Sequence, residues 1–129
     1  MAAGTGPDAK HLPIPAPIEA YGNGGFRFGG MSHRGSLLCF PDGIWAWSVV
    51  SVAELSEASL ASVFAHTGAV DVFLIGAGRD PWVLPAHLRA LFRERGISVD
   101  VMTTGAAVRT YNILLAEQRR AGVGLIAVD

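Results

Sequence analysis

The chain has 129 residues, of which 50% are hydrophobic and 16% are charged, and its formal net charge is -1. This length is enough for one domain with its own core, and the balanced charge gives no electrostatic basis for binding nucleic acid or an anionic membrane. The one cysteine, Cys39, excludes an internal disulfide and is typical of a reducing compartment. Because it lies in an apolar run, we expect a buried and unreactive thiol.

Targeting signals are not apparent in the sequence. No apolar stretch reaches the roughly 20 residues that cross a bilayer, so no transmembrane segment is expected. The N-terminus lacks the pattern of a secretory signal and the arginines of a mitochondrial transit peptide. We therefore expect a cytoplasmic protein. Nine arginines accompany one lysine, Lys10, a bias that is typical of a GC-rich bacterial genome and carries little functional weight.

The front of the chain divides into an arm and a β-rich region. Residues 1–16 are rich in proline and small residues and predict a flexible arm, whereas residues 17–129 predict a single α/β domain. Turns are expected at Gly22-Asn23-Gly24-Gly25 and at Pro41-Asp42-Gly43. The strands expected around these turns are 18–21, 26–28, 35–40 and 44–50.

The rear half alternates strands with helices. The expected elements are a helix from Ser56 to Gly68, a strand over 70–75, a helix from Pro85 to Gly96, a strand over 97–101, a helix over 103–120 ended by Gly122, and a strand over 123–128. Alternation of this kind predicts a mixed sheet with about three helices packed on it, in one layered α/β domain.

The helix expected from residue 103 carries the densest cluster of polar residues. On a helical wheel, Arg109, Asn112, Arg119 and Arg120 share one sector, with small residues beside Arg109. Thr103 or Thr104 can cap the helix, and Gly105 leaves first-turn N–H groups uncovered. One hypothesis is that Thr103, Thr104, Gly105, Arg109 and Asn112 bind a carboxylate or phosphate.

A structural role for the same arginines competes with this hypothesis. Arg109 would then tie the helix to neighbouring carbonyls or to an acidic side chain such as Glu117 or Asp100. Arg119 and Arg120 would complement the dipole at the helix C-terminus, or would contact a partner. Trp82, in a loop of turn residues, is either an anchor for a protein partner or a lid over the core.

Other chemical motifs are weak. Gly76-Ala77-Gly78 does not continue as a dinucleotide-binding loop, because Pro81 stands at the position of the third glycine. The four histidines share no metal-ligand spacing. Neither a nucleophile elbow nor a paired acid and base is visible. We therefore expect no catalytic residue, no metal and no cofactor.

Several segments resemble a known family. These are Met102-Thr103-Thr104-Gly105-Ala106-Ala107, Arg109-Thr110-Tyr111-Asn112, Glu117 with Arg119, and the glycines of Gly76-Ala77-Gly78 and Gly96-Ile97. Together they are similar to a family of domains of unknown function whose eukaryotic member is the mitochondrial assembly factor three of respiratory complex I. The resemblance covers roughly residues 17–128. Val108 stands where relatives often have cysteine, and Gln118 where they often have glycine.

The resemblance implies a layered α/β fold and a family without established catalysis. Two functions follow as hypotheses. The first is a non-catalytic binding or assembly module, linked to the biogenesis of membrane or respiratory complexes, that contacts a protein partner through the Arg109 face or the Trp82 loop. The alternative is a small anionic-ligand-binding or enzyme domain with a pocket at the Thr103 helix start. A homodimer is compatible with either, since a small sheet can leave an open edge.

Overall fold

A computed structural model describes residues 10–129, so residues 1–9 of the expected arm lie outside the described range. The strands are β1 (Lys10–Leu12), β2 (Ile18–Gly22), β3 (Gly25–Phe28), β4 (Met31–Arg34), β5 (Ser36–Phe40), β6 (Gly43–Trp47), β7 (Val72–Gly76), β8 (Ser98–Met102) and β9 (Ala121–Leu125). The helices are a 3-10 turn η1 (Val52–Glu54), α1 (Ala61–Phe64), α2 (Ala86–Glu94) and α3 (Thr104–Ala116). The expected mixed α/β fold is confirmed.

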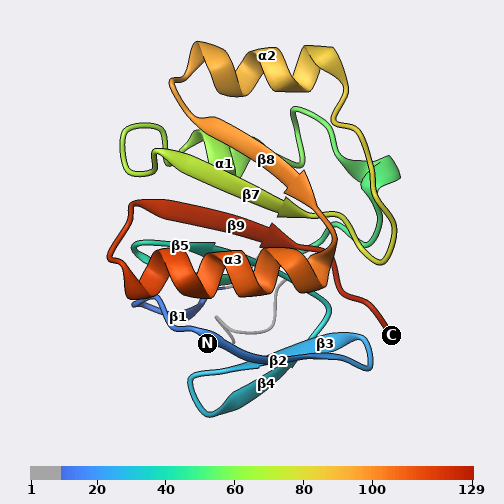
Figure 1. The fold of residues 1–129 in the computed structure, drawn as a ribbon, viewed down its shortest axis with the longest axis vertical. Coiled ribbons are helices and arrows are strands. Elements are labelled where there is room, and N and C mark those ends of the chain that lie inside the picture. The colour runs from blue at the N-terminus through green and yellow to red at the C-terminus, as the bar shows by residue number, and fades with distance from the viewer. Residues whose placement is uncertain (1–9) are drawn as a thin grey trace.

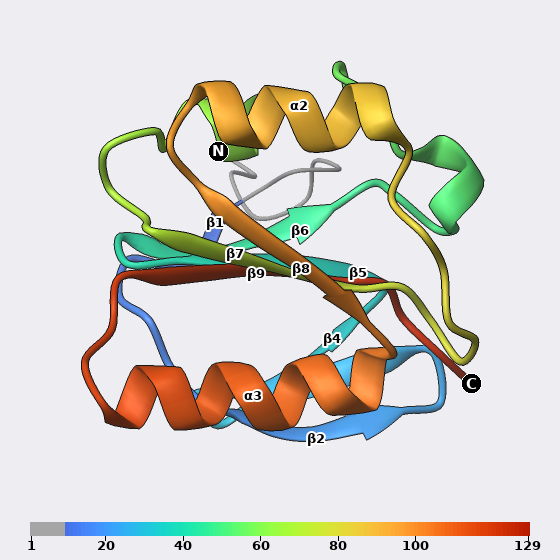
Figure 2. The same cartoon turned by 45° about the horizontal axis from the view of Figure 1, so that its top comes forward.

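A six-stranded sheet forms the middle layer, with the order β1-β6-β5-β9-β7-β8 (Figure 1). The strands β9, β7 and β8 run parallel, and the remaining neighbours are antiparallel. Figure 2 shows α2 on one side of this sheet and α3 on the other, with the three-stranded sheet β2-β3-β4 on the α3 side. None of the described helices is long and apolar enough to span a membrane.

The opposite placement of α2 and α3 follows from the chain path. From β7 the chain steps outward to β8 through α2, and then returns across β7 to β9 through α3. Because both crossovers are expected to be right-handed, a reversal of direction puts their helices on opposite faces. Each face has its own apolar cluster: Phe73, Leu88 and Phe92 belong to the α2 side, and Leu74, Ala107 and Tyr111 to the α3 side.

Two strands were not expected. Lys10–Leu12, placed in the arm by their proline-rich surroundings, pair with β6 across an irregular register, so the flexible arm does not extend through these residues. Met31–Arg34 form β4, which pairs with β3 although its sequence has no apolar alternation. Both strands are short and mostly exposed, which removes the hydrophobic pattern by which strands are predicted.

The helix predicted from Ser56 to Gly68 is mostly a series of turns. Only Ala61–Phe64 are α-helical, and the 3-10 turn η1 precedes them. Ser56 and Ser59 exchange hydrogen bonds between their side chains and main-chain N–H groups. This reciprocal pairing resembles a capping box, but the Ser59 hydroxyl also donates to the Ser56 carbonyl and holds the segment as a turn.

Helix α3 ends at Ala116, earlier than predicted. Gln118 adopts a left-handed conformation with φ 59°. The N–H groups of Gln118 and Arg119 donate to the carbonyls of Leu115 and Leu114, which is the Schellman arrangement. Gly122, expected to end the helix, instead lies in β9, where a Cβ would come within 3.0 Å of Phe40 and 3.1 Å of Phe73. The glycine is required by close packing and not by a turn.

Replacing Gln118 with glycine is expected to stabilise the protein. A left-handed backbone costs an L-residue about 1–2 kcal/mol, and the greater freedom of glycine in the unfolded chain offsets part of the gain. We expect a net increase of roughly 0.5 kcal/mol in the free energy of unfolding by urea. Glu117→Gly is the matched control. Glu117 has φ -86°, so glycine relieves no backbone strain there, and the change should destabilise the protein. Equal effects of the two changes would contradict this account.

Candidate functional site

The first turn of α3 is built around two threonines. Thr103 is the N-cap, and its side chain accepts a hydrogen bond from the Ala106 N–H. Thr104 is fully buried: its hydroxyl donates to the Ile126 carbonyl at 2.7 Å and accepts from the Gly78 N–H at 3.0 Å. The Thr104 N–H also donates to the Gly78 carbonyl. The hydroxyl and the N–H of Thr104 therefore join the start of α3 to the segments that follow β7 and β9.

The position of Thr104 matters for ligand binding. In open α/β sheets, ligands usually bind beside the carboxyl ends of parallel strands where the chain reverses its direction of winding. Here that place lies between β7 and β9, and Thr104 bridges it. Gly76 allows the close approach, because a Cβ there would stand 3.0 Å from the Thr104 Cα. The suggested anion pocket at the helix start is not supported by this geometry.

The remaining residues of that hypothesis are separated from the helix start. Asn112 accepts from the Ile18 N–H and donates to the Ile18 carbonyl, both at 2.9 Å, and so pairs with the edge of β2 as another strand would. Gly105 lies against the Tyr21 side chain. Arg109 is exposed and has neither a hydrogen bond nor an ion pair within residues 10–129. It makes none of the expected structural ties among these residues, and its role in anion binding stays a prediction.

The three residues expected at a partner surface differ in their contacts. Trp82 is half-buried and packs against the α2-side core, as a lid would. Arg120 forms two hydrogen bonds with Asp71, at 2.8 and 3.2 Å, which lower the pKa of that carboxyl below its usual range. The Arg119 Nη1 and Glu117 Oε1 atoms are 3.9 Å apart, and both side chains are exposed. Of these cations, Arg120 already has its carboxylate.

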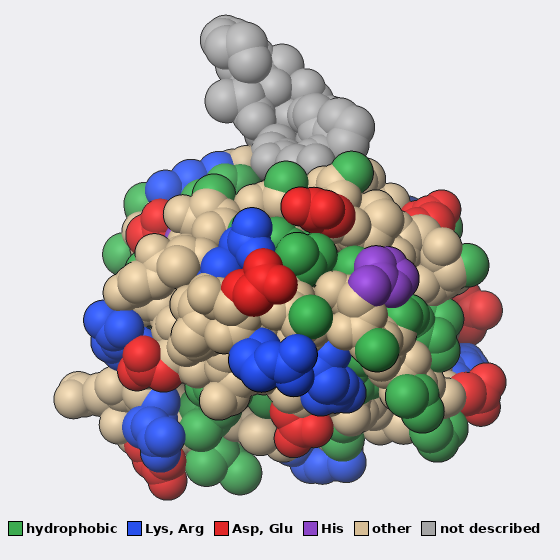
Figure 3. Space-filling view, turned by 90° about the horizontal axis from the view of Figure 1, so that it is seen from above, with side chains coloured by type: hydrophobic (Ala, Val, Ile, Leu, Met, Phe, Trp, Pro, Cys, Tyr) green, Lys and Arg blue, Asp and Glu red, His purple; other side chains and the backbone are tan. Residues whose placement is uncertain are grey.

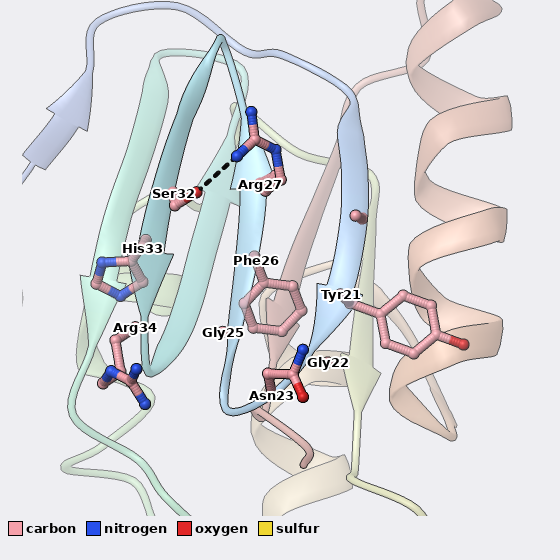
Figure 4. A pocket seen from close by; sticks show the side chains of 10 residues that line it. Tyr21, Gly22, Asn23, Gly25, Phe26, Arg27, Ser32, His33 and Arg34 are labelled. Carbon is pink, nitrogen blue, oxygen red and sulfur yellow. Dashed lines mark hydrogen bonds between the residues drawn. The ribbon is translucent and has the colours of Figure 1, made fainter.

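A hollow that the sequence analysis missed lies on the three-stranded sheet (Figure 4). Its volume is about 440 Å³, and we call it the small-sheet hollow; it is lined by Ala20, Tyr21, Gly22, Asn23, Gly25, Phe26, Arg27, Ser32, His33 and Arg34. Figure 4 shows Tyr21 pointing toward α3, away from Arg27 and Arg34. No acidic side chain lines the hollow.

Strand register explains why this surface is open. Ala20, Arg27 and Ser32 are cross-strand partners, and Gly22, Gly25 and Arg34 form the next such row. Cross-strand partners project from the same face of a sheet. Two glycines and an alanine therefore leave free space between the two arginines. Arg27 donates to Ser32 at 3.0 Å, whereas Arg34 has no hydrogen bond or ion pair with another described residue.

The signal for this hollow was present in the sequence but depended on register. Arg27 and Arg34 are seven positions apart in a glycine-rich stretch, and only the pairing of β3 with β4 shows that their rows are neighbours on one face. The expected turn at Gly22 to Gly25 is confirmed, with Asn23 at φ 53° and Gly24 at φ 79°.

Two histidines lie in contact where β1 meets the small sheet. The ring centroids of His11 and His33 are 4.5 Å apart. Burial lowers the pKa of His11, and burial together with the neighbouring His11 lowers the pKa of His33. The His11 Nε2 is buried without a hydrogen-bond partner, and His33 Nε2 lies 3.2 Å from the Ser36 carbonyl. Among residues 10–129, no three metal-binding side chains come together.

The one thiol is buried in the core of the α3 side. Cys39 is fully buried, and burial raises the pKa of its thiol, which keeps it protonated. Tyr111 lies in the same cluster, and burial raises the pKa of its phenol as well. An inert buried cysteine agrees with the sequence analysis.

Comparison with known proteins gives the family. Residues 18–126 match the family described as "Protein of unknown function (DUF498/DUF598)". The chain belongs to this family. The match covers the small sheet, both crossover helices and the parallel strands, so the whole described domain except β1 and the last residues is the DUF498/DUF598 domain.

Relatives within and beyond bacteria share this domain. An uncharacterized protein of Rhodobacter capsulatus is 37% identical over 85% of this chain and 83% of its own length. The NADH dehydrogenase [ubiquinone] 1 alpha subcomplex assembly factor 3 of Bos taurus is 29% identical over 91% of this chain and 64% of its own length. The chain thus spans slightly less than two thirds of that animal protein.

Solved structures have the same fold. A crystal structure described as an outer membrane protein from Bartonella henselae is 47% identical, with a TM-score of 0.88, and covers 92% of this chain and 100% of its own. An NMR structure of a Rhodopseudomonas palustris protein is 44% identical, with a TM-score of 0.84, over 99% of this chain and 93% of its own.

The contrast between Asn112 and Arg109 is testable by stability. Asn112→Ala leaves the Ile18 N–H and carbonyl without partners and is expected to lower the free energy of unfolding by about 1–3 kcal/mol. Arg109→Ala, on the same helix, removes no hydrogen bond and should change it by less than about 0.5 kcal/mol. Urea unfolding of both variants measures the difference. A large loss for Arg109→Ala would restore its structural role.

The histidine pair predicts a pH dependence. Because the pKa values of His11 and His33 are lowered on folding, the unfolded chain binds protons that the folded one does not, and stability falls as pH drops below about 6.5. His11→Phe keeps a ring beside Phe28 and His33 but does not titrate. We expect the loss of unfolding free energy between about pH 7 and pH 5 to be smaller in this variant. Parallel curves for the two proteins would show that the pair contributes nothing.

Proposed function

We propose that the chain is a non-catalytic binding module that assists the assembly of a membrane or respiratory complex. The family relationship to an animal protein named as an assembly factor of NADH dehydrogenase supports this role. The observation that carries the binding part is the small-sheet hollow, where Arg27 and Arg34 flank a floor of small residues without an acidic neighbour in its lining. We propose that it receives acidic side chains of a protein partner.

The chemistry of the hollow favours binding over catalysis. Arg27 and Arg34 carry guanidinium groups, which pair with carboxylates through two parallel hydrogen bonds. His33, the one titratable side chain in the lining with a shifted pKa, contacts the Ser36 carbonyl and His11 and has no carboxylate or nucleophile beside it. General acid–base catalysis needs such a partner group.

The hollow also has the rigidity that a binding surface requires. Its strands are joined by a tight Asn23-Gly24 turn, and the Gly24 N–H donates to the Val128 carbonyl at 2.8 Å. Behind it, Phe26 and Phe28 are buried in the α3-side core, with 3% and 0% of their surface exposed. The two arginines therefore project from a backbone that is held at its turn and beneath its face, which reduces the entropy lost on binding.

The expected role is tested in cells that lack the gene. Assembled complex I is measured on native gels, with the wild-type gene and variants restored in turn. We expect less assembled complex without the gene, recovery with the wild type, and little recovery with Arg27→Glu/Arg34→Glu, since the reversed charges repel an acidic partner. Arg109→Glu is the matched control, because Arg109 is equally exposed and lies outside the hollow.

Two results would contradict the proposal. Normal amounts of complex I in cells without the gene would remove the assembly role. Full recovery of complex I with Arg27→Glu/Arg34→Glu, at wild-type protein levels, would show that the small-sheet hollow plays no part in assembly. A photo-crosslinking residue at position 34, with one at position 109 as reference, then identifies the contacting protein, and a subunit or assembly protein of the complex is the expected product.

A further inference from the structure

One edge of the six-stranded sheet is open. Strand β8 is the last strand in the order and pairs with β7 alone. The Ser98 N–H donates to the Asp71 carbonyl at 2.9 Å, and the Met102 carbonyl accepts from the Ala77 N–H at 2.8 Å. Main-chain groups alternate in direction along a parallel strand, so the N–H and carbonyl groups of Val99 and Val101 point away from β7. Four hydrogen-bonding groups therefore lie along this edge.

The usual protection of an edge strand is weak here. Natural edges are shielded by proline, lysine, a bulge or a very short strand. The opposite edge, β1, is three residues long with an irregular register, and β2 is paired through Asn112. In contrast, β8 has five residues in continuous register with β7 and contains no proline or lysine. It has the geometry to accept a further strand.

A hollow of about 450 Å³ runs beside this edge, between α2 and the start of β8, and its lining is Arg89, Arg93, Gly96, Ile97, Ser98 and Val99. The two arginines are one helical turn apart on α2 and so project from the same side. Neither guanidinium group has a hydrogen bond or an ion pair with another described residue, whereas the Arg95 side chain contacts the Leu91 carbonyl and the Phe64 ring. Figure 3 looks onto the end of the molecule that carries α2 and shows basic side chains near its centre, with hydrophobic and acidic ones beside them.

We propose that the β8 edge binds an extended acidic segment of a partner protein by β-strand addition. The outward groups of Val99 and Val101 would bond to the main chain of this segment. Alternate side chains of an added strand face the α2 side, where Arg89 and Arg93 select carboxylates. Asp100 lies on the opposite face of β8, and its charge disfavours acidic side chains of the added strand that point to that face. The preferred sequence is therefore acidic at every second position.

Charge also decides against a second copy of this chain as the occupant. Antiparallel pairing of two β8 edges by a two-fold axis continues the sheet and places both α2 helices on the same face. The Arg89 and Arg93 side chains of the two copies would then approach one another across the junction, and like charges there oppose the pairing. An acidic strand has no such conflict.

The test uses the whole protein and a synthetic peptide that alternates glutamate with valine. Binding is followed by NMR of the backbone amides together with hydrogen exchange. At saturating peptide, we expect hydrogen exchange of the Val99 and Val101 amides to slow by about tenfold or more, because these amides gain hydrogen bonds. Arg89→Glu/Arg93→Glu should weaken binding by about tenfold or more, equivalent to 1.4 kcal/mol. Arg109→Glu, on α3 at the other side of the sheet and outside both hollows, is the control and should bind as the wild type does.

Three outcomes would overturn the proposal. One is equal binding of a peptide with the same composition but consecutive glutamates. Another is a shift of α2 signals without slower exchange at Val99 and Val101, which would mean charge pairing without strand addition. The third is slower exchange of these amides with rising protein concentration in the absence of peptide, which would identify a second copy as the occupant. None of these outcomes bears on the assembly role or on the small-sheet hollow.

Discussion

The fold depends on the hydrogen bonds of one buried side chain, that of Thr104. Its hydroxyl joins the Gly78 N–H, two residues beyond β7, to the Ile126 carbonyl, one residue beyond β9. Without it, the buried Ile126 carbonyl would lose this partner, at a cost of about 1–3 kcal/mol, and the partly buried Gly78 N–H would lose its acceptor. The absence of a side chain at Gly76 lets the helix approach closely enough for these bonds.

Because the start of α3 is held in place, the residues further along the helix that contact the three-stranded sheet are also held in place. Two turns after Thr104, Asn112 reaches the main chain of Ile18 and attaches the three-stranded sheet to the helix. Gly105 provides room for Tyr21 at the other end of β2. The small sheet is thus held against α3 at both ends of one strand, and the hollow on its outer face owes its position to these contacts. Thr104, Gly105 and Asn112, which the sequence suggested as ligand-binding residues, therefore make contacts that hold the fold together.

The segment from β7 to β8 was predictable because its signals are local. Continuous apolar residues in β7, the apolar stripe of α2, and proline and glycine at its ends each predict one element without knowledge of the rest. The failures arose where tertiary contacts decide. Gly122 lies in a strand where Phe40 and Phe73 leave no room for a side chain. Helix α3 ends at Ala116, two residues before Gln118, whose side chain gives no local sign of its left-handed backbone.

The candidate surfaces were less predictable than the fold, for a related reason. A helical wheel places Arg109 correctly, but it does not show that Thr104 bridges the adjacent crevice. Arg27 and Arg34 become neighbours only through the register of β3 with β4, and the open edge of β8 follows only from the strand order. Sequence patterns within one element therefore identify the buried face of that element, while binding surfaces require the pairing between elements.

The two surfaces lie on opposite sides of the six-stranded sheet. The small-sheet hollow belongs to the α3 side, and the groove beside β8 belongs to the α2 side. The sheet between them is continuous and its central strands are buried, so occupation of one surface leaves the other accessible. Both present arginines that have no carboxylate partner among residues 10–129, although the net charge of the chain is only -1. Such local excess of one charge attracts a partner without making the whole protein adhere to polyanions, as expected for a module that acts by holding proteins together.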